Sequence, residues 1–253
     1  MMKRVLLADR LKLKRTSLPI LLLLVPLLVL AYELVNLTYR SEYVAKQALL
    51  FKADSLWDYL LFDNSILFGL GFPLAITIAA SIIANIEHQS NSWKEILSQP
   101  VSRSKIYLSK FCWLFLGLTF SVSVFFIGML LLGKLLGFEG DIPLGLILGD
   151  SYSMLITALP IMSIQLWLSI TFKNQAFSIL IGAISAMMGL FLAAGSTTRW
   201  MPLAYPAQSS TISLQYEGLG YNGDLSAYLI INMLVGIVLL LIGLIHFTRR
   251  DMQ

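Results

Sequence analysis

The side chains that most often carry out chemistry in proteins are few and widely spaced in this sequence. His88 and His246 stand far apart, no His-Glu-x-x-His pattern occurs, and Cys112 is the only cysteine. Neither a zinc-protease site nor an intrachain disulfide is therefore predicted. The pattern Gly-x-x-x-x-Gly-Lys-Ser/Thr is also missing, so the chain is not expected to bind ATP through a P-loop. The spacing of these residues predicts no catalytic group and no cofactor of the chain's own.

Acidic residues inside long apolar runs are the remaining candidates for chemistry, namely Glu33, Asp63 and Asp150. An intramembrane aspartyl protease needs two acids that face each other at depth. A proton-coupled carrier also needs buried ionisable groups, since one charge near the membrane midplane costs at least about 2.5–3.5 kcal/mol. All three acids are expected near the outer ends of their spans. The sequence therefore does not favour an intramembrane enzyme, although that hypothesis stays open as an alternative.

The composition indicates what must position these residues. The chain is 57% hydrophobic and 13% charged, whereas soluble domains are roughly 45–50% apolar and about 25% charged. The mean hydropathy of +0.79 agrees, so the chain is predicted to be an integral membrane protein. Its net charge of +4 does not indicate nucleic-acid binding, because the basic residues cluster beside apolar runs.

Six apolar runs are long enough to cross the hydrocarbon core, which takes about 20 residues each. They are residues 18–39, 62–86, 105–133, 143–171, 175–195 and 225–247. The predicted fold is an all-α integral membrane protein, with one transmembrane domain over residues 1–253. Of the 18 Lys and Arg, thirteen fall on the side of the N-terminus and five on the other. The positive-inside rule then predicts that both termini lie in the cytoplasm.

Two segments outside the spans have a distinct character. Residues 1–17 hold six basic residues against one acid, Asp9, and are expected to form an interfacial helix on the anionic inner leaflet. A cleaved signal peptide is the alternative, but no small-x-small site follows the apolar run. Residues 196–224 are rich in proline and aromatic residues with few charges. They are expected to form short helices before span 6 that re-enter the outer leaflet, or else a structured outer loop.

The longest polar interruption on the predicted cytoplasmic side is residues 87–105. Trp93, Ile96 and Leu97 have the i, i+3, i+4 spacing of one apolar helix face, and Pro100 would end that helix. A short helix across the mouth of a membrane bundle would give a soluble partner a surface to push. The alternative is an ordinary loop with an incidental amphipathic turn.

A few polar residues lie deep within the predicted spans. The candidates for lining a pore are Thr77, Ser81, Gln165 and Asn232. Hydrogen bonds between helices are the more common role of such residues in membranes, and both interpretations stay open at this point.

Three stretches together resemble one known family. They are ADRLKLKRTSLPILLLLVP (8–26), EHQSNSWKEILSQPVSRSKIYLSK (87–110) and RWMPLAYP (199–206). They are similar to the basic leading segment, the cytosolic coupling stretch and the outer proline-aromatic segment of type-2 ABC exporter permeases. They are particularly similar to the permeases of bacterial lantibiotic and peptide-antibiotic immunity and export systems, which implies one permease domain over residues 1–253 in a bacterial cytoplasmic membrane.

This resemblance implies a function and partners. The chain would be the pore-forming subunit of an ATP-driven exporter of antimicrobial peptides or other amphipathic or lipid-like compounds. It would pair with a second permease, identical or paralogous, and with P-loop ATPase subunits that hold ATP and Mg²⁺. A membrane-anchoring or sensory subunit without transport is the alternative. The residues implied in contact with the ATPase, within a coupling segment at 87–104, are Glu87, Trp93, Lys94, Glu95, Ile96, Leu97 and Arg103.

Overall fold

The computed structural model of the protein describes residues 2–89, 93, 101–138 and 141–249. Most of this part is helical, and six stretches of it are long and apolar enough to cross a membrane. The predicted all-α membrane fold is confirmed. The helices are α1 (Met2–Leu13), α2 (Leu18–Tyr39), α3 (Ser41–Leu50), α4 (Leu56–Gln89), α6 (Arg103–Leu135), α7 (Leu144–Thr157), α8 (Leu159–Thr171), α9 (Gln175–Ala194) and α10 (Leu225–Arg249). A 3₁₀ helix, η1 (Tyr205–Gln208), and two strands, β1 (Ile212–Leu214) and β2 (Leu219–Tyr221), lie between α9 and α10.

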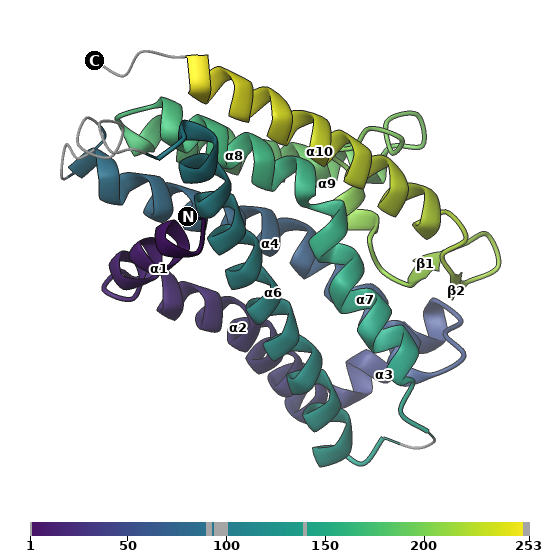
Figure 1. The fold of residues 1–253 in the computed structure, drawn as a ribbon. Helices are drawn as coiled ribbons and strands as arrows, with labels where there is room; N and C mark the ends of the chain where they lie inside the picture. The colour runs from purple at the N-terminus through teal and green to yellow at the C-terminus, as the bar shows by residue number, and fades with distance from the viewer. Residues whose placement is uncertain (1, 90–92, 94–100, 139–140, 250–253) are drawn as a thin grey trace.

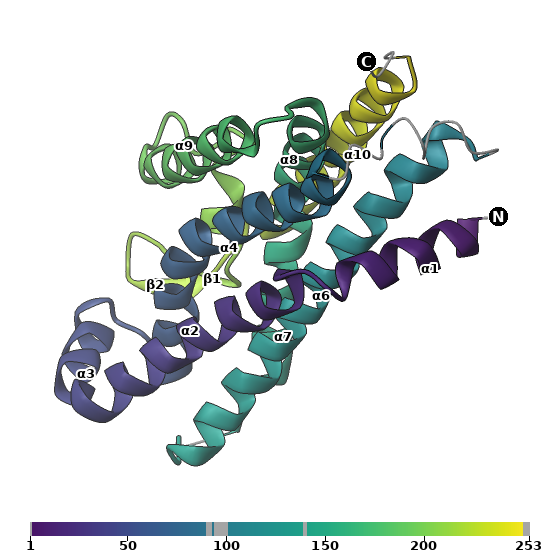
Figure 2. The ribbon, with the colours of Figure 1, turned by 90° about the vertical axis from the view of Figure 1, so that its left-hand side faces the viewer.

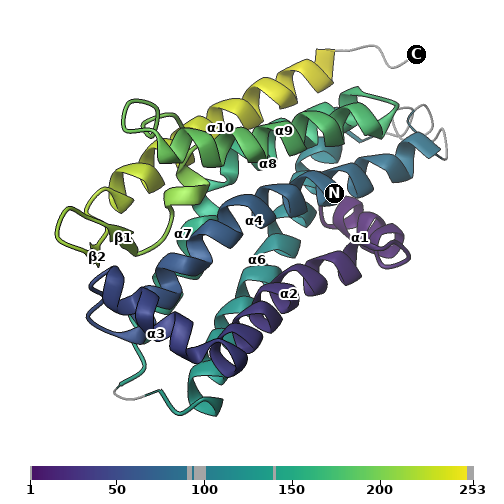
Figure 3. The ribbon, with the colours of Figure 1, turned by 180° about the vertical axis from the view of Figure 1, so that it is seen from behind.

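Helix α4 runs through the middle of the bundle. It packs against α2 and α6 on one side and against α8 and α9 on the other, while α10 packs on α8 (Figure 1). Seen from behind, α4 lies between α2 and α9 (Figure 3). Helix α4 and the α7–α8 stretch are mostly buried, whereas α2, α9 and α10 are mostly exposed. Helices α2, α9 and α10 therefore form much of the apolar outer surface of the single chain.

The two ends of the bundle carry different elements. One end holds α1, the end of α4, the start of α6 and the end of α10, and we call it the terminus end. The other end holds α3 and the β1–β2 hairpin, and we call it the hairpin end (Figure 2). Residues far apart in the sequence meet at each end, and both ends contain buried charged groups.

The predicted spans hold with two changes. The fourth, 143–171, is two helices, because α7 ends at Thr157 and α8 begins at Leu159 with Pro160 in its first turn. Proline has no backbone N–H to donate and crowds the preceding turn, which explains the break. In addition, α4 begins at Leu56, earlier than the predicted residue 62.

A glycine allows α9 to approach α4 closely. A Cβ atom at Gly182 would collide with the Thr77 hydroxyl and lie 2.8 Å from Gln165 Nε2. On the facing helix, Ala79 and Ala80 are fully buried. Helices in a membrane associate largely through such close van der Waals packing, so small residues here determine how deeply α9 sits against the core.

The segment 196–224 forms little helix, which corrects the expectation of short helices there. Its only described helical element is the single turn η1, and β1 pairs antiparallel with β2 so that Ile212 faces Tyr221. Pro206 lies inside η1. Proline is tolerated in the first turn of a helix, and the backbone of residues 212–221 is paired in the hairpin instead.

This segment is nevertheless packed on the bundle. The turn η1 lies against α4 and α9. The Leu219 N–H donates to the carbonyl oxygen of Phe51 at 2.8 Å, which ties the hairpin to the residues after α3.

Candidate coupling site at the terminus end

A buried ion pair joins α4 to α6. Glu87 lies at the end of α4 and Lys110 near the start of α6, and their side chains are 1% and 3% exposed. Lys110 Nζ donates to Glu87 Oε1 at 3.1 Å. Taking two charges out of water is costly, so each depends on the other for compensation. The pair therefore fixes the helix that precedes residues 90–102 to the helix that follows them.

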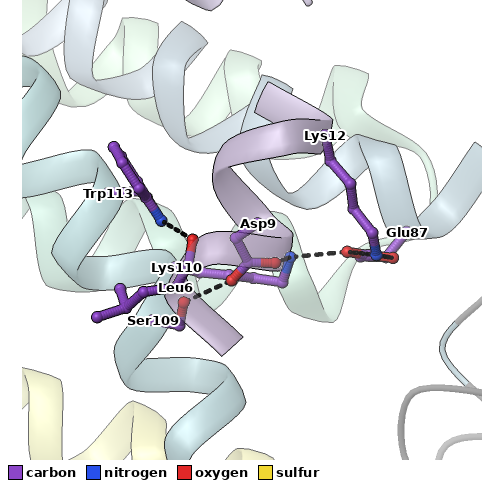
Figure 4. Close-up of polar contacts among 7 residues, drawn as sticks. All are labelled: Leu6, Asp9, Lys12, Glu87, Ser109, Lys110 and Trp113. Atoms are coloured by element: carbon purple, nitrogen blue, oxygen red, sulfur yellow. Dashed lines mark hydrogen bonds and ion pairs between the residues drawn. The ribbon is translucent and has the colours of Figure 1, made fainter. Parts of the chain in front are cut away.

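Helix α1 joins this pair from the side (Figure 4). Lys12 Nζ donates to both oxygens of Glu87, at 3.0 and 3.2 Å. Asp9 Oδ1 lies 4.0 Å from Lys110 Nζ. Two acids and two lysines thus alternate in one cluster whose formal charges cancel. We call Asp9, Lys12, Glu87 and Lys110 the ion cluster.

Two further hydrogen bonds hold α1 on α6. Ser109 Oγ donates to Asp9 Oδ2 at 2.5 Å, and Trp113 Nε1 donates to the Leu6 carbonyl at 3.0 Å (Figure 4). The helix predicted within residues 1–17 is present, and Asp9 and Leu13 are its buried residues. One side of α1 is therefore part of the folded bundle.

Trp93 lies against the Lys110 side of the cluster. Its side chain is 7% exposed, and its ring lies 5.5 Å from Lys110 Nζ, within the range of a cation–π contact. Trp93 Nε1 donates to His88 Nδ1 at 3.2 Å. His88 must then carry its proton on Nε2, which donates to the Ser169 carbonyl at 3.1 Å. A neutral histidine thus links Trp93 on one side to α8 on the other.

The end of α10 also reaches this region. Arg103 donates to the Thr248 carbonyl at 3.1 Å. The Phe247 ring lies 5.8 Å from the Trp93 ring and 5.6 Å from the Tyr107 ring. The segment after α4 is thereby attached through Trp93 to α4, α6 and α10, and Trp93 acts as an anchor within the chain.

The structure brings together Glu87, Trp93 and Arg103 from the set predicted to couple to an ATPase. Four others, Lys94, Glu95, Ile96 and Leu97, lie outside the described residues. The contact of this set with a partner stays a prediction.

Asp9, Lys12 and Lys110 were not identified from the sequence as the residues that join Glu87 in the ion cluster. Asp9 is the single acid among six basic residues in 1–17, and Lys110 lies inside the apolar run 105–133. A charge within a span usually has a partner, so Lys110 was a usable signal. Nothing in the sequence signalled the identity of these partners, because Asp9 is about a hundred positions away from Lys110.

Of the residues predicted to line a pore, Thr77 on α4 and Gln165 on α8 lie in contacts between helices of the single chain. Thr77 donates to the Pro73 carbonyl at 2.9 Å, and Gln165 is 3.5 Å from the Ser178 hydroxyl. Thr77 and Gln165 meet at Gly182. Ser81 is also buried on α4.

Asn232 lies apart from these residues on α10. Its Nδ2 donates to the Tyr228 carbonyl at 3.0 Å, and its Oδ1, which is buried, accepts no hydrogen bond within the described chain. Whether any of the four residues lines a pore stays a prediction.

Two acids were expected near the outer ends of their spans, and the structure shows that they are buried there. Glu33 is fully buried, and its carboxylate oxygens have no hydrogen-bond partner among the described residues. Asp150 is 7% exposed. These two acids are therefore ionisable groups buried within the single chain.

The comparison with known families decides what kind of bundle this is. The family model described as ABC-2 family transporter protein matches residues 5–189, which include most of α1 and the whole ion cluster. The chain belongs to the ABC-2 transporter family. No curated protein and no solved structure matches the chain.

Membership in the ABC-2 family makes the chain the transmembrane subunit of an ABC transporter and a multi-pass membrane protein. Such permeases generally pair with an ABC ATPase subunit. The terminus end, where α4 and α6 approach each other across the segment 90–102, is then the candidate place for the partner to act.

Proposed function

We propose that this chain is the permease of an ATP-driven exporter, and that a separate P-loop ATPase drives it through the segment between α4 and α6. The observation that carries the proposal is the ion cluster at the base of that segment. It connects both flanking helices and α1 through buried charges. A push on the segment would move these three helices together, since separating them would leave charges buried without partners.

The rest of the bundle offers a surface along which such a movement could occur. Helix α4 meets α9 through Gly182 and short side chains. The contact is therefore formed by small side chains and contains no ion pair between described residues. The movement would change how α4 sits against α8 and α9. Thr77 and Gln165, which lie at that contact, would then be exposed to a passing substrate.

We also propose the sidedness and the class of substrate. The terminus end would face the cytoplasm, because most Lys and Arg gather there. The substrate would be an amphipathic peptide or lipid-like compound, moved outward by two permeases working as a pair. The support for this substrate is the resemblance of residues 8–26, 87–110 and 199–206 to the permeases of peptide-antibiotic immunity.

The test is whether the segment recruits the ATPase. The affinity-tagged chain would be purified from its native membranes, and vanadate-sensitive ATP hydrolysis would be measured in the eluate. The double reversal Lys94→Glu/Glu95→Lys keeps the net charge and is expected to remove at least nine-tenths of the co-purified ATPase activity. Equal yields of wild-type and variant protein in the membrane would show that insertion is unaffected.

A matched control is available at the hairpin end. Glu42 and Lys46 are exposed on α3, and the reversal Glu42→Lys/Lys46→Glu also keeps the net charge. It is expected to leave co-purified ATPase activity unchanged. If the reversal at 94 and 95 had no more effect than this control, the coupling role of the segment would be refuted.

A further inference from the structure

Asp150 is a buried carboxylate that forms no ion pair with any residue in the described part of the chain. It lies on α7 and is 7% exposed. Its Oδ1 accepts from the Thr211 N–H at 3.1 Å, and the Ser210 hydroxyl is within hydrogen-bond reach. The ion pairs between described residues all lie at the terminus end. Because a buried charge is costly unless paired, Asp150 needs either a proton or a cation.

A small cavity lies beside this carboxylate. Its polar lining is Asp150 and four buried serines, namely Ser65, Ser151, Ser209 and Ser210. The space suits about one water-sized particle. Phe68 and Phe125, whose ring centroids are 4.3 Å apart, form part of its apolar lining.

The serines present lone pairs and few hydrogens to this cavity. Three of the hydroxyls donate to the backbone carbonyls of Phe62, Ile147 and Pro206 at 2.6–2.9 Å, whereas the Ser210 hydroxyl lies within reach of both the Leu61 carbonyl, at 3.2 Å, and Asp150. A hydroxyl has one hydrogen and two lone pairs, so once the hydrogen is used the oxygen can only accept or coordinate. The cavity therefore combines one negative charge with several neutral oxygen ligands.

We propose that this cavity binds a small monovalent cation, with Na⁺ as the best fit. A cation of charge +1 balances the single carboxylate, whereas a divalent ion would leave a net positive charge buried. Divalent cations of this kind are also usually held by more than one carboxylate or by waters. The described residues contain no cluster of three His, Cys, Asp or Glu side chains suited to a transition metal.

The site joins three parts of the chain. Ser65 lies on α4, Asp150 and Ser151 on α7, and Ser209 and Ser210 between η1 and β1. A bound cation would clamp the residues before the hairpin onto both helices. The short hydrogen bond from Ser153 to the Ser209 carbonyl holds the same backbone. This inference concerns binding alone and is independent of the proposed transport function.

Binding would be measured directly with ²²Na⁺ on the purified full-length chain in detergent, with choline as the inert replacement cation. Wild-type protein is expected to bind about one Na⁺ per chain in a saturable way that unlabelled Na⁺ reverses. Asp150→Asn, which keeps an oxygen for the Thr211 N–H, is expected to weaken binding at least tenfold. Asp63→Asn, at another acid of the hairpin end, is expected to leave binding unchanged.

Two results would overturn the proposal. One is no saturable binding by folded wild-type protein, which would mean that a proton neutralises Asp150. The other is equal binding by wild type and Asp150→Asn. Should Asp150→Asn fail to fold, Ser151→Ala decides instead, because it removes one ligand and keeps the charge. A severalfold weaker affinity for Na⁺ is expected, and an unchanged affinity would count against the site.

Discussion

The two ends of the bundle bury acids in different ways. At the terminus end Glu87 contacts two lysines, at 3.0 and 3.1 Å, and both come from other helices. At the hairpin end Asp150 contacts a backbone N–H and hydroxyl groups. The first arrangement is complete within the chain, whereas the second lacks a positive charge.

This difference suggests different physical roles for the two ends. A carboxylate neutralised by lysines of its own chain holds three helices together at all times. A carboxylate left to an external cation holds its neighbours only while the cation is bound. Under the proposals above, the terminus end would transmit a push from a partner, and the hairpin end would be held together only while the cation is bound.

The largest expected effect is at the centre of the ion cluster. Glu87→Gln would leave Lys110 buried with a reduced counter-charge, and breaking such a pair costs about 3–5 kcal/mol of the free energy of unfolding. Thermal unfolding in detergent would measure the loss. The double variant Glu87→Gln/Lys110→Met should recover most of it, because an apolar side chain replaces the buried charge. A double variant as unstable as Glu87→Gln alone would show that the pair is not the cause.

A smaller loss is expected from the hydrogen bond that holds α1. Ser109→Ala removes the donor to Asp9, and hydrogen bonds to charged groups contribute about 1.5–3 kcal/mol. Ser185→Ala is the matched control, since that serine is partly exposed on α9 and donates to the Ile181 carbonyl within its own helix. Equal unfolding temperatures for the two variants would contradict the role of Ser109.

The effect at the hairpin end should depend on salt. In choline buffer Asp150→Asn is expected to be within about 1 kcal/mol of wild type, because the amide keeps the bond to Thr211 and carries no charge. In Na⁺ the wild type should gain stability from the bound ion while the variant does not. Unfolding temperatures in the two salts measure this. If the unfolding temperatures of wild type and Asp150→Asn differed by the same amount in both salts, no Na⁺ would stabilise the hairpin end, and the contrast between the two ends would be lost.

The smallest effect is expected at the edge of the ion cluster. Lys12 is 39% exposed, whereas Lys110 is 3% exposed, although both contact Glu87. Exposed ion pairs contribute less than about 1 kcal/mol, so Lys12→Met should barely change the unfolding temperature. A loss as large as that of Glu87→Gln would mean that Lys12, and not the buried Lys110, neutralises the acid.

The membrane spans could be predicted from the sequence, but the structure at the two ends of the bundle could not. Run length and composition determine which residues cross a membrane, so the six spans were predicted to within a few residues. Pro160 marked the break in the fourth span, yet prolines within spans are often tolerated, and the break was not predicted. The hairpin at 212–221 is stabilised by pairing within the segment and by contact with Phe51, and neither leaves a periodic pattern.

The candidate site was predicted only in part for a related reason. Glu87, Trp93 and Arg103 were chosen from one continuous stretch, where sequence order brings residues together. Their partners Asp9, Lys12 and Thr248 come from the two ends of the chain. Such pairings depend on how helices pack, which a single sequence does not encode in its spacing.

The most direct test of the central claim is which side of the membrane the coupling segment faces. Cys112→Ser would first remove the native thiol, and Lys94→Cys and Tyr216→Cys would then be made separately. Tyr216 is fully exposed on the hairpin and serves as the opposite marker. With a membrane-impermeant maleimide, we expect position 216 to be labelled in intact cells and position 94 only after permeabilisation. Labelling of position 94 in intact cells would put the segment out of reach of any cytoplasmic ATPase and contradict the account.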